Sequence, residues 1–154
     1  MKRTILATAV LGLAVSGAGL ASAHPGNGAQ KAGVASSGIP YLACAPATGT
    51  GSQGANGFAV LNAPGKPGSP LKIVGELALR NAKPGTYDVQ LSTGAGCGTK
   101  VGTLTVGTDG SGNASIESAG GAGSYFVVAT QTIESALANQ TLPAQYASAL
   151  VTLN

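Results

Sequence analysis

The sequence has no tryptophan, few other aromatic residues and few charges. Aromatic side chains make up 4% of the 154 residues and charged side chains 8%. A nucleic-acid-binding protein normally presents clustered lysine and arginine to the phosphate backbone, and no such cluster occurs in this sequence. We therefore expect no nucleic-acid partner.

The chain also lacks a recognisable catalytic constellation. It contains one histidine, His24, and five carboxylate side chains, which are spread over predicted strand faces, a turn and a short helix. A Ser-His-Asp triad would require His24 to fold back onto the domain, and no two carboxylates are placed as an acid/base pair. The sequence therefore predicts a protein that is not an enzyme and uses no cofactor.

The first 23 residues have the pattern of a cleaved secretory signal peptide. Lys2 and Arg3 supply the positive charge, residues 5–15 form a short apolar stretch, and Ala-Ser-Ala at 21–23 fits the cleavage site. An uncleaved anchor is the alternative. Cleavage would leave residues 24–154, with 8 − 2 = 6 Lys+Arg against 5 Asp+Glu. We expect a secreted or cell-surface protein with no stable membrane span after cleavage.

Only two cysteines occur in the chain, Cys44 and Cys97. An even number of cysteines in a small exported domain predicts a disulfide, and two cysteines allow one pairing. The bridge would close a segment of 97 − 44 = 53 residues, for which the chain-entropy model gives about 4 kcal/mol of stabilisation. Such a bridge suits a chain with 25 glycines, whose core must be built from small aliphatic side chains.

The remainder reads as one domain with a tail. Residues 24–40 are rich in Gly, Ala and Ser without periodicity, which predicts a flexible N-terminal tail. Residues 41–154 contain apolar-polar alternations separated by Gly, Pro, Asn and Asp, which is typical of antiparallel strands joined by tight turns. The pattern predicts about seven strands, at Phe58–Leu61, Leu71–Leu79, Tyr87–Leu91, Gly102–Val106, Asn113–Glu117, Ser124–Thr130 and Tyr146–Leu153, with a short strand at Tyr41–Cys44 that the disulfide would tie down.

The alternation also assigns strand faces. In the strand predicted at residues 71–79, Leu71 lies on the apolar face with every second residue after it, and Gly75 on that face indicates a bulge or a close approach of backbone. In the last strand, Ala147, Val151 and Leu153 share one side, opposite Tyr146. Before this strand, Thr132 is placed to cap a short helix at Ile133–Asn139.

One stretch resembles a known corner. Leu79, followed by Pro-Gly-Thr-Tyr-Asp-Val at 84–89, is similar to the corner of fibronectin type III, other immunoglobulin-like and carboxypeptidase-regulatory-like domains, in which a tyrosine anchors a late strand. The resemblance implies an antiparallel β-sandwich in which Tyr87 has the anchoring role. More chain follows Tyr87 than one final strand can use, so strand order stays open. The expected fold is an all-β, about seven-stranded, immunoglobulin-like sandwich with one disulfide and one short helix.

These features predict a secreted, non-catalytic binding or structural module of a bacterial cell surface or extracellular matrix. Its partner would be an unidentified protein or polysaccharide. Loops on a rigid sandwich commonly carry recognition. The preferred binding surface is therefore the pair of Gly-rich loops at residues 45–57 and 92–100, which the disulfide would bring together.

A copper-binding protein is one alternative. Cleavage after residue 23 would make His24 the mature N-terminus, whose amine and imidazole can chelate Cu(II). Pro25 has no amide hydrogen, so it cannot supply a deprotonated backbone nitrogen as the next ligand.

Two further alternatives use the surface of the domain. A carbohydrate-binding module would need exposed aromatic rings, for which the candidates are Tyr41, Tyr125 and Tyr146. A self-assembling surface subunit would use the exposed edge strands of the sheet. The first alternative depends on where three tyrosines point, and the second on which strands lie at an edge.

Overall fold

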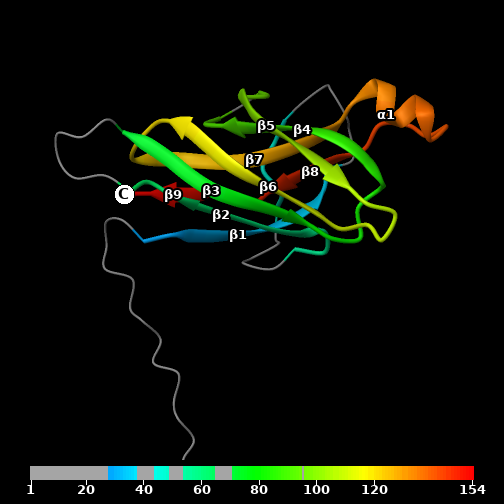
Figure 1. Cartoon of the computed structure of the whole chain (residues 1–154). Coiled ribbons are helices and arrows are strands. Elements are labelled where there is room, and N and C mark those ends of the chain that lie inside the picture. Colours follow the sequence, from blue (N-terminus) through cyan, green and yellow to red (C-terminus); the bar gives the residue numbers. More distant parts are fainter. Residues whose placement is uncertain (1–27, 38–43, 49–53, 65–70, 95) are drawn as a thin grey trace, which may run out of the picture.

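The computed structural model describes residues 28–37, 44–48, 54–64, 71–94 and 96–154 (Figure 1). Within these ranges the chain forms nine β-strands and one short α-helix. The strands are β1 (Gln30–Ser36), β2 (Gly57–Asn62), β3 (Lys72–Leu79), β4 (Gly85–Ser92), β5 (Thr99–Val106), β6 (Gly112–Ala119), β7 (Gly123–Gln131), β8 (Gln145–Ser148) and β9 (Val151–Leu153), and the helix is α1 (Ile133–Ala138).

The strands form a single antiparallel sheet that nearly closes on itself (Figure 1). The strand order is β5-β4-β7-β8-β1-β2-β3-β6, and β9 pairs with β7 off this path. The first part of β1 pairs with β2 and its second part with β8, so β1 links two groups of strands. The end strands β5 and β6 follow each other in the chain and lie close together, which gives the sheet its barrel-like shape.

The nine strands correct the prediction of about seven in a sandwich. The strand expected at Tyr146–Leu153 is divided into β8 and β9, which both pair with β7. The register shifts by one residue between Ala147, opposite Val128, and Val151, opposite Tyr125. In the interruption, the Ala149 amide donates to the Gly33 carbonyl oxygen at 2.9 Å. The all-β class, the antiparallel pairing and the short helix are confirmed.

The other additional strand, β1, lies in the segment that was predicted to be a flexible tail. That prediction was wrong for residues 30–36, which pair on both sides and bury Ala32, Gly33 and Val34. Its side chains are small, so the segment has little contrast between apolar and polar positions. The strand is stabilised by its partners rather than by its own pattern. Residues 24–27 and 38–43, the latter including most of the strand predicted at Tyr41–Cys44, lie outside the described ranges.

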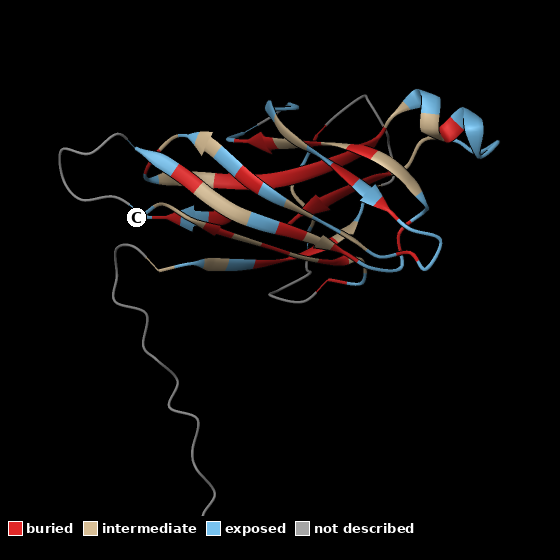
Figure 2. Ribbon diagram, viewed as in Figure 1, coloured by how far each residue is buried: buried red, intermediate tan, exposed pale blue. Residues whose placement is uncertain are grey.

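The main core is formed by buried side chains of the strands, and buried residues occur along these strands (Figure 2). Its largest fully buried aliphatic side chains come from four strands and are Leu61, Ile73, Leu77, Leu104 and Ile116. The predicted alternation in residues 71–79 is confirmed at the buried positions of β3, whereas Leu71 lies before the strand and is 63% exposed. A Cβ at Gly75 would collide with the Val60 carbonyl oxygen, so the close approach comes from the neighbouring strand.

Tyr87 has the contact expected of an anchoring tyrosine at the start of β4. Its hydroxyl donates to the Lys83 carbonyl oxygen at 2.7 Å, and the Lys83 amide donates to the Tyr146 hydroxyl at 2.9 Å. The two phenol rings lie 5.8 Å apart between centroids. Burial, followed by the neighbouring Tyr146, raises the pKa of the Tyr87 hydroxyl. This corner ties the turn before β4 to β8.

The predicted helix is present and begins at its expected cap. Thr132 is in extended conformation, and its side chain accepts a hydrogen bond from the Ser135 amide at 3.3 Å. The helix buries Ala136, while Ile133 and Leu137 point to solvent. In the described part of the chain, no helix is both long and apolar enough to cross a membrane.

Candidate functional site

Strand β7 is buried on both of its faces. Tyr125, Val127 and Ala129 belong to the main core, whereas Phe126 and Val128 point to the opposite side of the sheet. There they form a second, smaller cluster with Cys44 and Ala147. A strand whose residues are apolar on both sides needs a cover on each side. On the outer side, the described cover includes the chain around the disulfide.

The predicted disulfide between Cys44 and Cys97 is present, with the two Cα atoms 4.8 Å apart. It joins the segment at residues 44–48 to the loop that follows β4. The Gly96 amide also donates to the Cys44 carbonyl oxygen at 3.4 Å, and the Ala47 amide donates to the Ser148 carbonyl oxygen at 2.8 Å. Both segments are therefore attached to the outer side of the sheet by specific bonds.

The loop carrying Cys97 is held against the end of β4 by its own contacts. The Ser92 hydroxyl donates to the Gly96 carbonyl oxygen at 2.9 Å and accepts from the Gly98 amide at 2.7 Å. A Cβ at Gly98 would collide with the Leu91 carbonyl oxygen. A glycine is needed after Cys97 because the backbone passes directly over β4.

An apolar pocket of about 460 Å³ lies beside the disulfide. It is lined by Cys44, Ala45, Pro46, Thr93, Gly94, Gly96, Ser124, Phe126 and Leu150. None of these side chains carries a charge, since Cys44 is disulfide-bonded. The lining offers apolar surface with two hydroxyl groups, which suits the burial of an uncharged group. It offers no acid or base for proton transfer.

The pocket brings together the described parts of the two loops that were preferred as the binding surface. Residues 45, 46, 93, 94 and 96 come from those loops. Residues 49–53 and 95 lie outside the described ranges. The disulfide therefore places the two loops side by side, as expected from their sequence positions.

Sequence reasoning did not find the remaining wall of the pocket. Ser124 and Phe126 come from β7, and Leu150 comes from the link between β8 and β9. Two signals in the sequence point to these positions. Residues 125–128 are apolar without alternation, and Leu150 interrupts the alternation of the final segment.

The sulfur of Cys44 has a polar neighbour that is itself buried. The Gln145 side-chain amide lies with its nitrogen 3.7 Å from Cys44 Sγ and donates to the Thr130 hydroxyl at 2.9 Å. The Gln145 side-chain oxygen accepts a hydrogen bond from the Ser37 hydroxyl at 2.8 Å. Gln145 is only 1% exposed. These bonds fix the orientation of the amide, so that its N–H group points at the sulfur.

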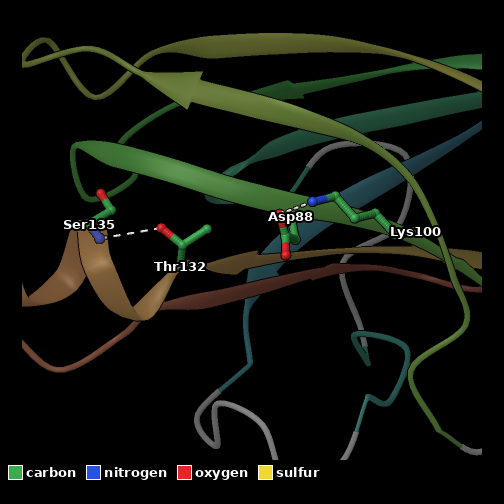
Figure 3. A network of polar contacts seen from close by, with 4 residues as sticks. All are labelled: Asp88, Lys100, Thr132 and Ser135. Carbon is green, nitrogen blue, oxygen red and sulfur yellow. Dashed lines mark hydrogen bonds and ion pairs between the residues drawn. The ribbon is translucent and has the colours of Figure 1, made fainter.

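A second hollow, of about 410 Å³, lies near the start of α1 and contains charged residues. Lys100 and Asp88 form an ion pair at 2.7 Å, and Thr132 accepts from the Ser135 amide (Figure 3). The Ser135 hydroxyl in turn accepts from the Thr86 amide at 2.9 Å. The ion pair joins β5 to β4, and the bond between Thr86 and Ser135 connects α1 to β4. We therefore interpret them as structural.

The residues singled out for the alternative functions do not gather at either hollow. Tyr125 and Tyr146 are only 8% and 5% exposed, which corrects their assignment as candidate exposed rings for carbohydrate. His24 and Tyr41 lie outside the described residues. Within the described ranges, no group of three or more His, Cys, Asp or Glu side chains is placed to hold a metal ion.

Comparisons with protein-family models, curated proteins and solved structures found no match for this chain. We therefore assign no family and infer the function from the geometry of the site. The disulfide is consistent with an oxidising, extracellular compartment.

Proposed function

We propose that this protein is a secreted, non-catalytic binding module of a bacterial cell surface or extracellular matrix, and that its ligand contacts the apolar pocket beside the disulfide. One observation carries the proposal: a disulfide joins two coil segments around a pocket lined by uncharged groups. Such a pocket can bury part of a ligand without reorganising its walls.

The lining favours an uncharged, apolar group as the part of the ligand that is bound. Pro46 and Leu150 supply aliphatic surface, whereas Phe126 is fully buried in the wall of the pocket. Leu150 is 51% exposed, so it is available for contact with a partner. An aliphatic side chain of a surface protein has the chemistry that this lining accepts, and the nearby hydroxyls of Thr93 and Ser124 can bond to its backbone.

The sheet would serve as the rigid support for this pocket. Strands β6, β3, β2 and the first part of β1 form one group, and β5, β4, β7 and β8 form the other. We propose that the two groups act as the layers of an immunoglobulin-like sandwich, with β1 passing from one to the other. The tyrosine corner at Tyr87 supports this interpretation.

The alternatives have less support. Carbohydrate binding loses two of its three candidate rings, because Tyr125 and Tyr146 are buried. Copper binding depends on His24, outside the described residues. Self-assembly through edge strands is disfavoured by the close approach of β5 and β6 at the two ends of the sheet.

Co-sedimentation tests the proposal. The exported, oxidised protein is mixed with washed envelopes of the producing organism and with a panel of insoluble polysaccharides, beside a control without ligand. We expect saturable pelleting with one of these materials. Pelleting in the control would indicate self-assembly, and absence of pelleting with every material would contradict a surface-binding module.

A matched pair of variants tests the pocket itself. Leu150→Ser removes an exposed apolar wall of the pocket, and we expect binding to weaken about tenfold because one central apolar contact is lost. Leu142→Ser is the control, since Leu142 is 81% exposed and lies outside the pocket. Equal binding by the two variants would place the ligand elsewhere on the molecule.

A further inference from the structure

The two cysteines of the disulfide differ sharply in their access to solvent. Cys44 is 2% exposed and packs on Phe126, Val128 and Ala147 in the outer cluster. Cys97 lies in an exposed loop between two glycines and is itself exposed. An attacking thiolate must approach one sulfur of a disulfide, and its access decides which sulfur that is. Here only Cys97 is open to an attacker from solvent.

The two sulfurs also differ in their ability to leave. The Gln145 amide nitrogen lies 3.7 Å from Cys44 Sγ and directs an N–H group at it. A hydrogen bond from this group is stronger to a thiolate than to a neutral disulfide sulfur, because the acceptor then carries a charge. The better stabilised thiolate is the better leaving group in thiol-disulfide exchange. Burial of Cys44 among apolar side chains and the Gln90 side-chain oxygen, 3.9 Å from the same sulfur, act against a thiolate there, and the Gln145 N–H group offsets part of this cost. Access therefore decides for attack at Cys97, which makes Cys44 the leaving group.

We propose that the Cys44–Cys97 disulfide is a thiol-exchange site at which a low-molecular-weight thiol attacks Cys97, and that its opening controls the apolar pocket. The exchange itself follows from the asymmetry of the two sulfurs. The control of the pocket rests on the proposed binding function. The modification that results is a mixed disulfide on Cys97.

The exchange proceeds in two balanced steps. In the first, the thiolate RS⁻ forms a bond to Cys97 Sγ, the bond between the two cysteines breaks, and its electron pair remains on Cys44 Sγ. In the second, another RS⁻ attacks the thiol-derived sulfur of the mixed disulfide, which releases RSSR and the Cys97 thiolate. The two cysteine thiolates then take up two protons. The protein disulfide is reduced by two electrons, and two RSH molecules are oxidised to RSSR.

Opening the bond would release one wall of the pocket and leave the other in place. The loop after β4 keeps its two bonds to the Ser92 hydroxyl. The segment at residues 44–48 keeps the bond from Ala47 to Ser148 and the weaker bond from Gly96 to Cys44. The wall formed by Cys44, Ala45 and Pro46 would lose its covalent tie. The pocket should therefore bind its ligand less well in the reduced protein.

Mapping of the adduct tests the direction of the exchange. The oxidised full chain is treated with free cysteine under native conditions, quenched with an alkylating reagent at several times, digested and analysed by mass spectrometry. We expect the mixed disulfide on Cys97 and the alkyl group on Cys44 in the early samples. Adducts on Cys44, or on both cysteines equally, would overturn the proposal.

Three variants separate native exchange from exchange through unfolding. Gln145→Leu removes the donor to Cys44 Sγ, and we expect the first step to slow about tenfold because a hydrogen bond to a charged leaving group is lost. Thr130→Val is the matched control, since it removes the other partner of the same amide and leaves the donor present. Leu77→Ala weakens the main core and should leave the rate unchanged. A faster exchange in Leu77→Ala would show that thiols reach the bond only through unfolding, which would contradict the proposal.

Binding measurements test the second half of the proposal. The co-sedimentation assay is repeated with oxidised protein and with protein carrying the Cys97 adduct. We expect pelleting to fall at least tenfold on exchange and to recover after reoxidation. Pelleting that is unchanged by the adduct would overturn the control of the pocket while the binding function stands. A lack of pelleting by the oxidised protein would overturn the binding function and this control together, and the adduct map would still decide the exchange.

Discussion

The two faces of β7 are covered in different ways. Its inner face packs into the main core, whose side chains come from the other strands of the sheet. Backbone hydrogen bonds join these strands to their neighbours. Its outer face carries Phe126 and Val128, and the described cover there includes two coil segments joined by one disulfide. The inner cover is formed by the fold itself. The outer cover depends on a covalent bond that a thiol can open.

The inner face of β7 therefore contributes mainly to stability, and the outer face carries the pocket. Opening the inner cover requires the sheet to come apart, because its members pair with one another along their length. Opening the outer cover requires the loss of one disulfide and a few hydrogen bonds. The pocket lies at the outer cover, where the structure can change without unfolding.

The largest expected effect comes from truncating the main core. Leu77 is fully buried, and Leu77→Ala should lower the free energy of unfolding by about 2–5 kcal/mol, with or without the disulfide, because it leaves a cavity in the core. Denaturant unfolding followed by circular dichroism measures it. Val128→Ala sharpens the comparison, since its cost of about 2 kcal/mol should shrink when the disulfide is absent. Equal costs of Val128→Ala in both backgrounds would show that the two faces behave as one unit.

The next effect comes from removing the disulfide. The double substitution Cys44→Ser and Cys97→Ser should lower the free energy of unfolding by about 2–4 kcal/mol, because the unfolded chain is no longer constrained. Amide hydrogen exchange locates the change. We expect exchange at Ala47 and Gly96, whose amides bond across the outer cover, to rise more than the lower global stability accounts for, and exchange at Leu77 to rise only in step with that stability. Exchange that rises equally at Leu77 would contradict a separate outer cover.

The smallest expected effect comes from the corner at the start of β4, where the Tyr87 hydroxyl bonds to Lys83. Tyr87→Phe removes the hydroxyl bond to Lys83 and should lower the free energy of unfolding by about 1 kcal/mol at neutral pH. The substitution should also change how the free energy of unfolding depends on pH in the alkaline range. The pKa of Tyr87 is raised in the folded protein, so above about pH 10 the unfolded chain releases this proton while the folded chain retains it.

The contribution of the Tyr87 hydroxyl to the free energy of unfolding is therefore fully present below about pH 10. It falls as the pH rises, by about 1.4 kcal/mol per pH unit. Urea unfolding of both proteins at several pH values between about 9 and 12 measures how the free energy of unfolding depends on pH. The curve for Tyr87→Phe should be flatter than that of the unsubstituted protein. Parallel curves would show that Tyr87 is ionised as readily in the folded protein as in the unfolded chain.

Local patterns in the sequence predicted several parts of the fold. The alternation in residues 71–79 predicted which side chains of β3 are buried, although Leu71 itself lies before the strand and is exposed. Thr132 predicted the start of α1. The count of two cysteines allowed one pairing, which the structure contains. These features depend on the identity and spacing of neighbouring residues, which a sequence displays directly.

Other parts were not predictable from local pattern. Strand β1 has small side chains and is ordered by its neighbours on both sides. The predicted alternation of the last segment fails because the register with β7 shifts by one residue between β8 and β9. Tyr146 and Val151 therefore both reach the main core, and Ala147 reaches the outer cluster. The pocket draws on several segments that are distant in the sequence, and the irregular patterns at residues 125–128 and at Leu150 do not show that these segments meet.

The sequence by itself determined the all-β class, the disulfide and the helix, because each depends on residue types and short spacings. Only the tertiary structure decided which faces are covered. Tyr125 is buried, Phe126 faces the disulfide and Leu150 stays exposed, although all three are large apolar residues. Their positions depend on contacts between segments far apart in the chain, and these contacts form only when the whole sheet has folded.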